Sequence, residues 1–398
     1  MLDRRRFLSG LGASAFAPAL VAASGGEGSP EPLERALVLS GGGARGAYEA
    51  GVVGALAARY GVSDGSPLPS YEVVCGTSIG ALNGWFVATG QYSKLRELWY
   101  GSSKEHIIRA KPRYAALRDS QSGVLDRAIS AVSLIALMRN ERGLLQSEPV
   151  YNWIAENIDP SDFLLVPLAW AVTNLVEQRP EYFYLLPKKS GEELPHRVVA
   201  ALQMTLGPHA VVREATPDIL HRAIFASAAL PIVFDPVLMP GTDGAVTAYC
   251  DGGVASNSPV GIAHALAAAA DVVLLDPPFE GETDYHDAVE IAFGAYATMQ
   301  RKILEVEMRN AYFQSVGKRA LERLAPRERA RAMQGSEPLA GFMHAVPATD
   351  LRYIRPDRVL PVGVVGFNDQ VGIGETYRLG WLDMARGFTP YDWRTFQL

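Results

Sequence analysis

The sequence predicts an α/β fold of three layers (α/β/α), in which helices cover both faces of a mainly parallel sheet. Short, strongly apolar runs alternate with longer segments of helical periodicity, which is typical of βαβ units. Two of the apolar runs end in glycine-rich turns, at 41–46 and 76–80. The chain has 398 residues and 48% hydrophobic content, which is enough to fill the large core that such a fold requires.

The first 34 residues are expected to lie outside this fold. Arg4 to Leu8 reads Arg-Arg-Arg-Phe-Leu, which fits the twin-arginine export pattern, and a short apolar run with small residues before Ser24 follows it. Serine, glycine and proline dilute the run too much for a membrane span. We therefore expect a signal peptide at 1–23, a flexible linker at 24–34 and an exported protein, periplasmic or secreted. A basic start to a cytosolic protein is the alternative.

The rest of the chain, 35–398, is expected to form one domain, with a core at about 36–276 and a helical C-terminal extension at 286–398. Its apolar runs and periodic segments define the expected elements. Strands are expected at 36–39, 71–75, 165–174, 181–186, 248–250, 271–276 and 352–361, and helices at 47–60, 81–89, 130–138, 149–158, 216–229, 260–270, 286–325 and 373–386.

Composition excludes several classes of function. The net charge is −6 and no basic stripe with interleaved aromatic residues occurs, which argues against nucleic acid as a partner. The chain has only two cysteines, Cys75 and Cys250, so it has no disulfide scaffold and no thiolate metal cluster. Its seven histidines are scattered, with no His-Glu-x-x-His spacing. We therefore expect neither a metal nor a cofactor.

The turn after the strand at 71–75 has the sequence of a nucleophile elbow, Gly76-Thr77-Ser78-Ile79-Gly80. Ser78 would occupy a strained turn that holds its hydroxyl clear of the backbone. Gly76 and Gly80 are explained if strand and helix pass too close for a Cβ. A helix that begins at Ile79 would direct its free N–H groups at the place where negative charge develops.

The earlier glycine loop has two interpretations. Gly41-x-Gly43-x-x-Gly46 fits the dinucleotide fingerprint, but the next strand has no carboxylate at its tip, because Glu72 lies too early. The alternative is an oxyanion hole. Consecutive glycines leave backbone N–H groups unshielded, so several can point at one developing alkoxide. The residues favour this second interpretation, with the hole formed by Gly41, Gly42, Gly43, Ala44 and Arg45.

A serine nucleophile requires a base, and Asp251 is the best candidate. It follows a short predicted strand, and two glycines after it allow the backbone to turn sharply towards the elbow. In a dry site an aspartate can take the serine proton directly. By contrast, His264, His286 and His344 do not sit on a turn after a strand, where a triad histidine is expected.

Taken together and in this order, the three loops resemble those of the patatin-like phospholipase family. The stretches Ala226–Pro231 and Asn257–Val260 are also similar to family patterns. The resemblance implies hydrolysis of lipid acyl esters by a Ser–Asp dyad, with Ser78 as nucleophile and Asp251 as base, without a metal. Arg45 would either brace the glycine loop or meet a lipid phosphate.

The expected partners are a lipid or phospholipid ester and, transiently, a membrane surface, with no obligate protein partner. Two alternatives remain open at this point. The first is a dinucleotide-binding oxidoreductase that uses the glycine loop, and the second is an inactive lipid-binding protein.

The cysteines add a geometric prediction. Cys75 precedes Ser78 by three residues and Cys250 directly precedes Asp251. If the two strands that deliver the dyad end side by side, the cysteines lie near one another beneath it. We expect two buried, reduced thiols.

Overall fold

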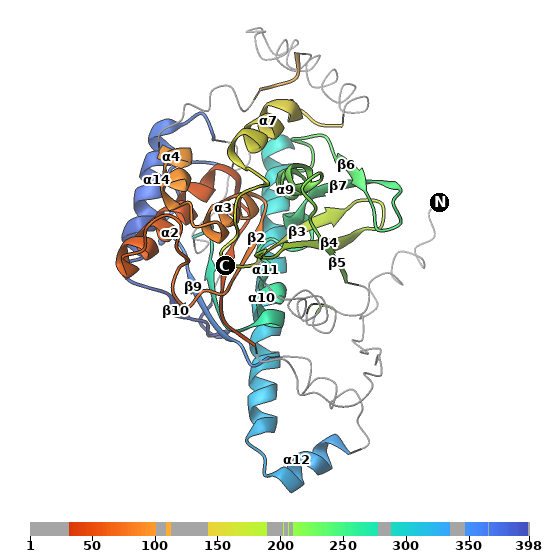
Figure 1. Cartoon of the computed structure of the whole chain (residues 1–398), viewed down its shortest axis with the longest axis vertical. Helices are drawn as coiled ribbons and strands as arrows, with labels where there is room; N and C mark the ends of the chain where they lie inside the picture. The colour runs from red at the N-terminus through yellow and green to blue at the C-terminus, as the bar shows by residue number, and fades with distance from the viewer. Residues whose placement is uncertain are drawn as a thin grey trace.

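The computed structural model describes residues 32–100, 109–112, 142–188, 202, 206, 210–277, 288–334, 347–364 and 366–396. These residues form a ten-stranded sheet with helices on both faces (Figure 1), which confirms the predicted α/β/α fold. The strand order is β10-β9-β8-β1-β2-β3-β4-β5, while β6 pairs with β7 and β7 also pairs with β3. The predicted signal peptide, the predicted helix at 130–138, His286 and His344 lie outside the described residues.

The elements have the following bounds. The strands are β1 (Leu33–Leu39), β2 (Val73–Thr77), β3 (Leu168–Asn174), β4 (Arg179–Leu185), β5 (Val211–Glu214), β6 (Val237–Pro240), β7 (Val246–Asp251), β8 (Ala267–Val273), β9 (Asp350–Ile354) and β10 (Thr389–Pro390). The helices are α2 (Gly46–Tyr60), α3 (Ile79–Ala88), α4 (Tyr92–Tyr100), α7 (Ser147–Asn157), α9 (Leu220–Ala228), α10 (Val260–Leu266), α11 (Ala288–Glu322), α12 (Pro326–Met333) and α14 (Gln370–Asp383), with 3-10 turns η2 (Gly43–Arg45) and η3 (Gly252–Val254).

The centre of the sheet is parallel and buried on both faces. Strands β9, β8, β1, β2 and β3 all run in one direction. Along β1, Leu37 and Leu39 belong to the core beneath α2, α3, α9 and α14, whereas Ala36 and Val38 belong to the core shared with α10 and α11. This alternation follows from the two-residue period of a strand, and it explains why the strand sequences are apolar throughout.

One edge of β3 carries two strands in succession. Strand β2 pairs in parallel with Leu168–Ala171, and β7 pairs antiparallel with Val172–Asn174. Because β7 runs in the opposite direction, the carboxyl ends of β2 and β7 point at each other. The prediction that the two strands end side by side is therefore wrong, since they meet end to end along β3.

The same topology corrects the expectation that the cysteines are neighbours. Cys75 pairs with Ala169 of β3 and Cys250 with Thr173. Four residues of strand separate these positions, or about 13 Å, which is far beyond disulfide reach. Both cysteines are buried and unpaired, and burial raises the pKa of each thiol above its usual range.

Several element boundaries also differ from the prediction. Ala267–Ala270 was expected to continue a helix, but it forms the start of β8 because it pairs with Leu33–Ala36 of β1. Tertiary pairing thus outweighs the helix propensity of alanine. Strand β1 begins at Leu33, inside the predicted linker, and the predicted helical extension supplies β9 and β10 to the sheet. Strands β5 and β6 are not among the predicted strands.

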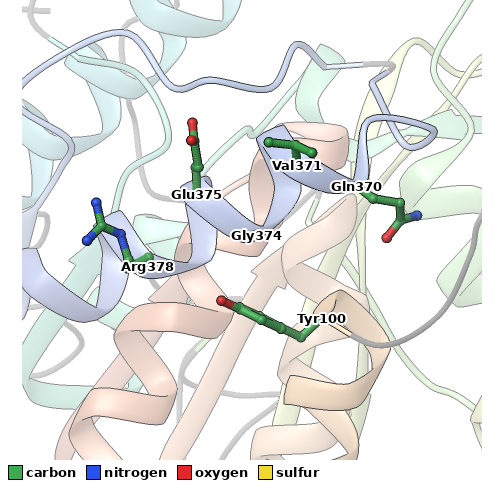
Figure 2. A pocket seen from close by; sticks show the side chains of 6 residues that line it. All are labelled: Tyr100, Gln370, Val371, Gly374, Glu375 and Arg378. Carbon is green, nitrogen blue, oxygen red and sulfur yellow. The ribbon is translucent and has the colours of Figure 1, made fainter.

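Two further features bear on binding. No helix within the described ranges is both long enough and apolar enough to cross a membrane. A shallow pocket of about 300 Å³ lies between Tyr100 of α4 and the first turns of α14, where Val371, Glu375 and Arg378 project (Figure 2). Its lining includes none of the site residues predicted from the sequence.

Candidate active site

The elbow at Ser78 has the strained backbone that its sequence predicts. Ser78 lies between the end of β2 and the start of α3, and its φ of 55° is a left-handed value that a residue with a side chain rarely adopts. A Cβ added to Gly80 would lie 2.3 Å from the Leu39 carbonyl oxygen, and one on Gly76 would lie 2.4 Å from the Gly80 carbonyl oxygen. Strand and helix therefore touch at this turn. Such strain costs about 1–3 kcal/mol, which the surrounding contacts must offset.

A serine of α9 holds the elbow in place. The Ser78 amide donates a hydrogen bond to Ser227 Oγ at 2.8 Å, and Ser227 Oγ in turn donates to the Ala171 carbonyl of β3 at 2.7 Å. Ser227 is fully buried. The sequence pattern at Ala226–Pro231 resembles the family but does not by itself assign a role to Ser227. Its position shows that it fixes the turn that carries Ser78.

Asp251 lies next to Ser78 because β7 ends where β2 ends. The Ser78 hydroxyl lies against the Asp251 carboxyl, and the Gly253 amide donates a hydrogen bond to Asp251 Oδ1 at 2.6 Å. Burial raises the pKa of Asp251 to about 7, although the contacts with Ser78 and Gly253 act to lower it. At neutral pH this carboxyl can therefore both accept and return a proton.

The glycine loop borders Ser78, but most of its amides are already occupied. A Cβ on Gly41 would lie 3.2 Å from Ser78 Cβ. The amides of Gly41 and Ala44 donate to the carbonyls of Asn257 and Val364, each at 2.8 Å, and the Arg45 amide donates to the Gly42 carbonyl at 3.2 Å.

These contacts reduce the number of backbone amides that are available to the predicted oxyanion hole. It was expected to use the five residues from Gly41 to Arg45, but three of those N–H groups already have acceptors. Among the described residues, only Gly42 and Gly43 of the five lack one. Gly43 has a φ of 58°, and a Cβ there would lie 2.1 Å from the Val364 carbonyl oxygen, so only glycine fits.

The Arg45 side chain braces the loop. Its guanidinium pairs with Asp276 Oδ1 at 2.6 Å, just beyond β8, and Arg301 of α11 lies 3.7 Å from the same oxygen. Of the two roles left open for Arg45, this contact supports bracing. The ion pair links the glycine loop to the carboxyl end of the central sheet.

Asn257 joins the glycine loop to the turn after Asp251. Its carbonyl accepts from the Gly41 amide, and its side chain donates to the Gly41 carbonyl at 3.4 Å. Gln300 of α11 donates to Asn257 Oδ1 at 2.9 Å. Gln300 also lies against Gly253, where an added Cβ would meet its Nε2 at 2.4 Å. Sequence reasoning missed Gln300, because a helical pattern does not show which polar residue faces a site.

A second buried carboxyl supports the turn after Asp251. Thr77 Oγ1 donates to the Ser256 carbonyl at 2.9 Å, and Ser256 Oγ donates to Glu307 Oε1 of α11 at 2.6 Å. Burial raises the pKa of Glu307 to about 8, so it is largely protonated at neutral pH. Its helical sequence context gave no signal for this role.

His264 takes no part in the site. It lies on α10, with Nδ1 2.9 Å from Thr349 Oγ1 and Nε2 2.9 Å from Gln314 Oε1, and burial lowers its pKa to about 4. Helix α10 leads into Ala267, which pairs with Leu33 at the start of β1. Ser78 lies beyond the opposite, carboxyl end of these strands. The two ends are separated by seven residues of strand, or about 20 Å.

The described residues contain no group of three or more His, Cys, Asp or Glu side chains placed to hold a metal ion. The arrangement that they do contain is a strained serine turn, a buried carboxyl against that serine, and a glycine loop beside the serine. All three lie at the carboxyl end of a parallel sheet, which is the layout of an α/β hydrolase.

The sequence pattern of the patatin-like phospholipase family matches residues 37–264, more than half of the chain, so the chain belongs to this family. This membership confirms the resemblance noted above and identifies the protein as a lipid acyl hydrolase. Among solved structures, the chain is similar to VipD from Legionella pneumophila, with 14% identity, a TM-score of 0.33, and coverage of 91% of this chain and 68% of VipD. No curated protein matches the sequence.

Proposed function

We propose that the protein is an exported serine hydrolase that cleaves carboxylic ester bonds of lipids, as a phospholipase A or lipid esterase, by a Ser78–Asp251 dyad. One observation carries this proposal: a serine on a strained elbow has its hydroxyl against a buried carboxyl. The substrate lies in membranes, so the protein contacts a membrane surface transiently.

The geometry supports a two-step mechanism. Asp251 takes the Ser78 proton while Oγ attacks the acyl carbonyl, and the resulting oxyanion lies towards the amides of Gly42 and Gly43. The carbon–oxygen bond to the alcohol then breaks, and Asp251 returns the proton to the departing oxygen. Water repeats the sequence on the acyl-serine ester and releases the fatty acid. No other proton carrier is required.

The test uses the purified protein without residues 1–23. We expect it to hydrolyse p-nitrophenyl esters and phospholipid vesicles, and we expect a fluorophosphonate to label Ser78 covalently. The acyl-chain length and head group preferred in this screen define the substrate. If neither hydrolysis nor labelling occurs, the proposed hydrolase function is wrong, and binding to phospholipid vesicles would then support the inactive lipid-binding alternative. Tight binding of a dinucleotide would instead support the oxidoreductase alternative.

The pH profile is a further prediction. Asp251 acts as a base only when it is ionised, so kcat/KM should fall as the pH drops through about 7, the pKa to which burial raises this carboxyl. Its titratable neighbours do not interfere. Burial and the nearby Asp251 raise the pKa of Cys250 to about 12, and burial keeps Tyr296 protonated. Full activity maintained down to pH 5 would show that the catalytic base titrates below that pH, which would contradict the raised pKa of Asp251.

Export can be tested separately in the full-length chain. Replacing both Arg4 and Arg5 by Lys should block a twin-arginine signal and leave the uncleaved protein in the cytoplasm. The measurement is cell fractionation with immunoblotting of the two size forms. A shortened form of the double variant in the periplasm, in the same amount as from the unmodified chain, would contradict the proposed export route.

A further inference from the structure

Helix α11 closes one side of the site, although it lies outside the residues that the family pattern covers. It runs along the long axis of the molecule (Figure 1) and packs against η3, the turn that follows Asp251. Tyr296 and Gln300 stand one turn apart on it, so their side chains share a face. Gln300 reaches both Asn257 and Gly253, as described above. Tyr296 therefore lies on the same face of α11 as Gln300, one helical turn before it in the sequence.

The Tyr296 hydroxyl is buried and lies near the dyad. Burial, together with the neighbouring Asp251 carboxyl and Cys250 thiol, raises its pKa above the usual range, so the phenol keeps its proton. The Gln300 amide interacts with it, but among the described residues no hydrogen bond of normal length and angle reaches this hydroxyl. Leaving a buried hydroxyl without such a bond costs about 1–3 kcal/mol. A group of this kind in a native site calls for a partner.

The chemistry of the Ser78–Asp251 dyad indicates which hydrogen-bond partner the Tyr296 hydroxyl would meet. The Asp251 carboxyl is bound by the Ser78 hydroxyl and the Gly253 amide. After the attack, it must also reach the oxygen of the departing alcohol, because it returns the proton there. The Tyr296 hydroxyl is a buried donor on a helix that packs against the turn after Asp251, and it is within electrostatic range of that carboxyl, so it is suitably placed to meet that oxygen.

Building on the proposed function, we infer that Tyr296 is a further catalytic residue whose hydroxyl donates a hydrogen bond to the leaving-group oxygen of the ester. Asp251 supplies the transferred proton, and Tyr296 keeps its own. The substrate class that benefits is an ester of an aliphatic alcohol, such as a glycerol ester. An aliphatic alkoxide is a poor leaving group and depends on hydrogen-bond and proton donors in the transition state.

The test compares leaving groups in the Tyr296→Phe variant. For glycerol esters we expect kcat/KM to fall by roughly tenfold to a hundredfold, the lower part of the usual range for proton-donor assistance. For the p-nitrophenyl ester with the same acyl chain we expect a change below about threefold, because p-nitrophenolate departs without assistance. The matched control is Tyr312→Phe. Tyr312 lies about four turns further along α11 and packs edge-to-face against Phe313 and Tyr391.

The outcomes separate this inference from the proposed function. An equal loss on both esters would assign Tyr296 a structural role, and an unchanged rate on glycerol esters would remove it from catalysis; either result overturns the inference alone. Inactivity of the unmodified protein on every ester would overturn the proposed function first. Thermal unfolding and the rate of fluorophosphonate labelling show whether the Phe variant keeps the fold and the elbow. Both should match the unmodified protein.

Discussion

Replacing Ser78 with alanine is expected to lower ester hydrolysis by about 10⁴-fold or more, to the level that binding and the oxyanion hole alone provide. No neighbouring hydroxyl can substitute for it. Thr77 Oγ1 is bound to the Ser256 carbonyl, and Ser227 Oγ is held between the Ser78 amide and the Ala171 carbonyl. The measurement is the initial rate on a p-nitrophenyl ester, together with loss of fluorophosphonate labelling.

Ser227→Ala is the matched control for this variant. It removes a buried hydroxyl that orients the elbow and leaves the nucleophile in place, so its activity should fall much less than that of Ser78→Ala. Thermal unfolding should show that both variants fold. Activity of Ser78→Ala above a few per cent of the unmodified protein would mean that another residue is the nucleophile.

The Asp251→Asn variant should lose activity by about 10⁴-fold, because an amide cannot accept the serine proton at neutral pH.

The same substitution should also change how the free energy of unfolding depends on pH, in a direction that follows from the pKa of Asp251. The folded carboxyl has a pKa of about 7, whereas an unfolded aspartate has a pKa of about 3.9. The unmodified protein therefore loses stability as the pH rises from about 4 to about 7, by an amount on the order of 4 kcal/mol.

Asparagine has no such proton to lose. Denaturant unfolding at pH 4 and pH 8 should show that the advantage of Asp251→Asn over the unmodified protein grows between the two values. An advantage that is the same at both values would mean that the native site does not hold the carboxyl in its neutral form. Retained activity in the Asn variant would remove Asp251 from the mechanism, whatever the stability data show.

Much of this architecture could be predicted because its signals are local. An apolar run that ends in glycines identifies a strand and the turn after it, so Ser78 and the loop at 41–46 were found from short stretches of sequence. The pairing partners of a strand are a non-local property. The alanines at 267–270 form a strand only because β1 offers an edge to them, and the meeting of β2 with β7 depends on the register of both along β3.

The finer details of the site also depend on distant parts of the chain. Which amides of the glycine loop keep a free N–H is decided by the carbonyls of Val364 and Asn257. Tyr296 and Gln300 belong to a long amphipathic helix, whose periodicity predicts a buried face but does not say that this face covers a dyad. Their positions at the site depend on the packing of α11 against η3.

Because β2 and β7 meet end to end, Ser78 and Asp251 come together only when both strands are correctly paired with β3. Thr77, which directly precedes Ser78, and Asp251 pair with adjacent residues of β3, Ala171 and Val172. A slip of one residue in β7 would carry Asp251 about 3.3 Å along the sheet and turn its side chain to the opposite face. During synthesis the elbow emerges from the ribosome long before Asp251 does. Under the proposed dyad mechanism, a nascent or truncated chain that has already formed its serine turn therefore still lacks its base.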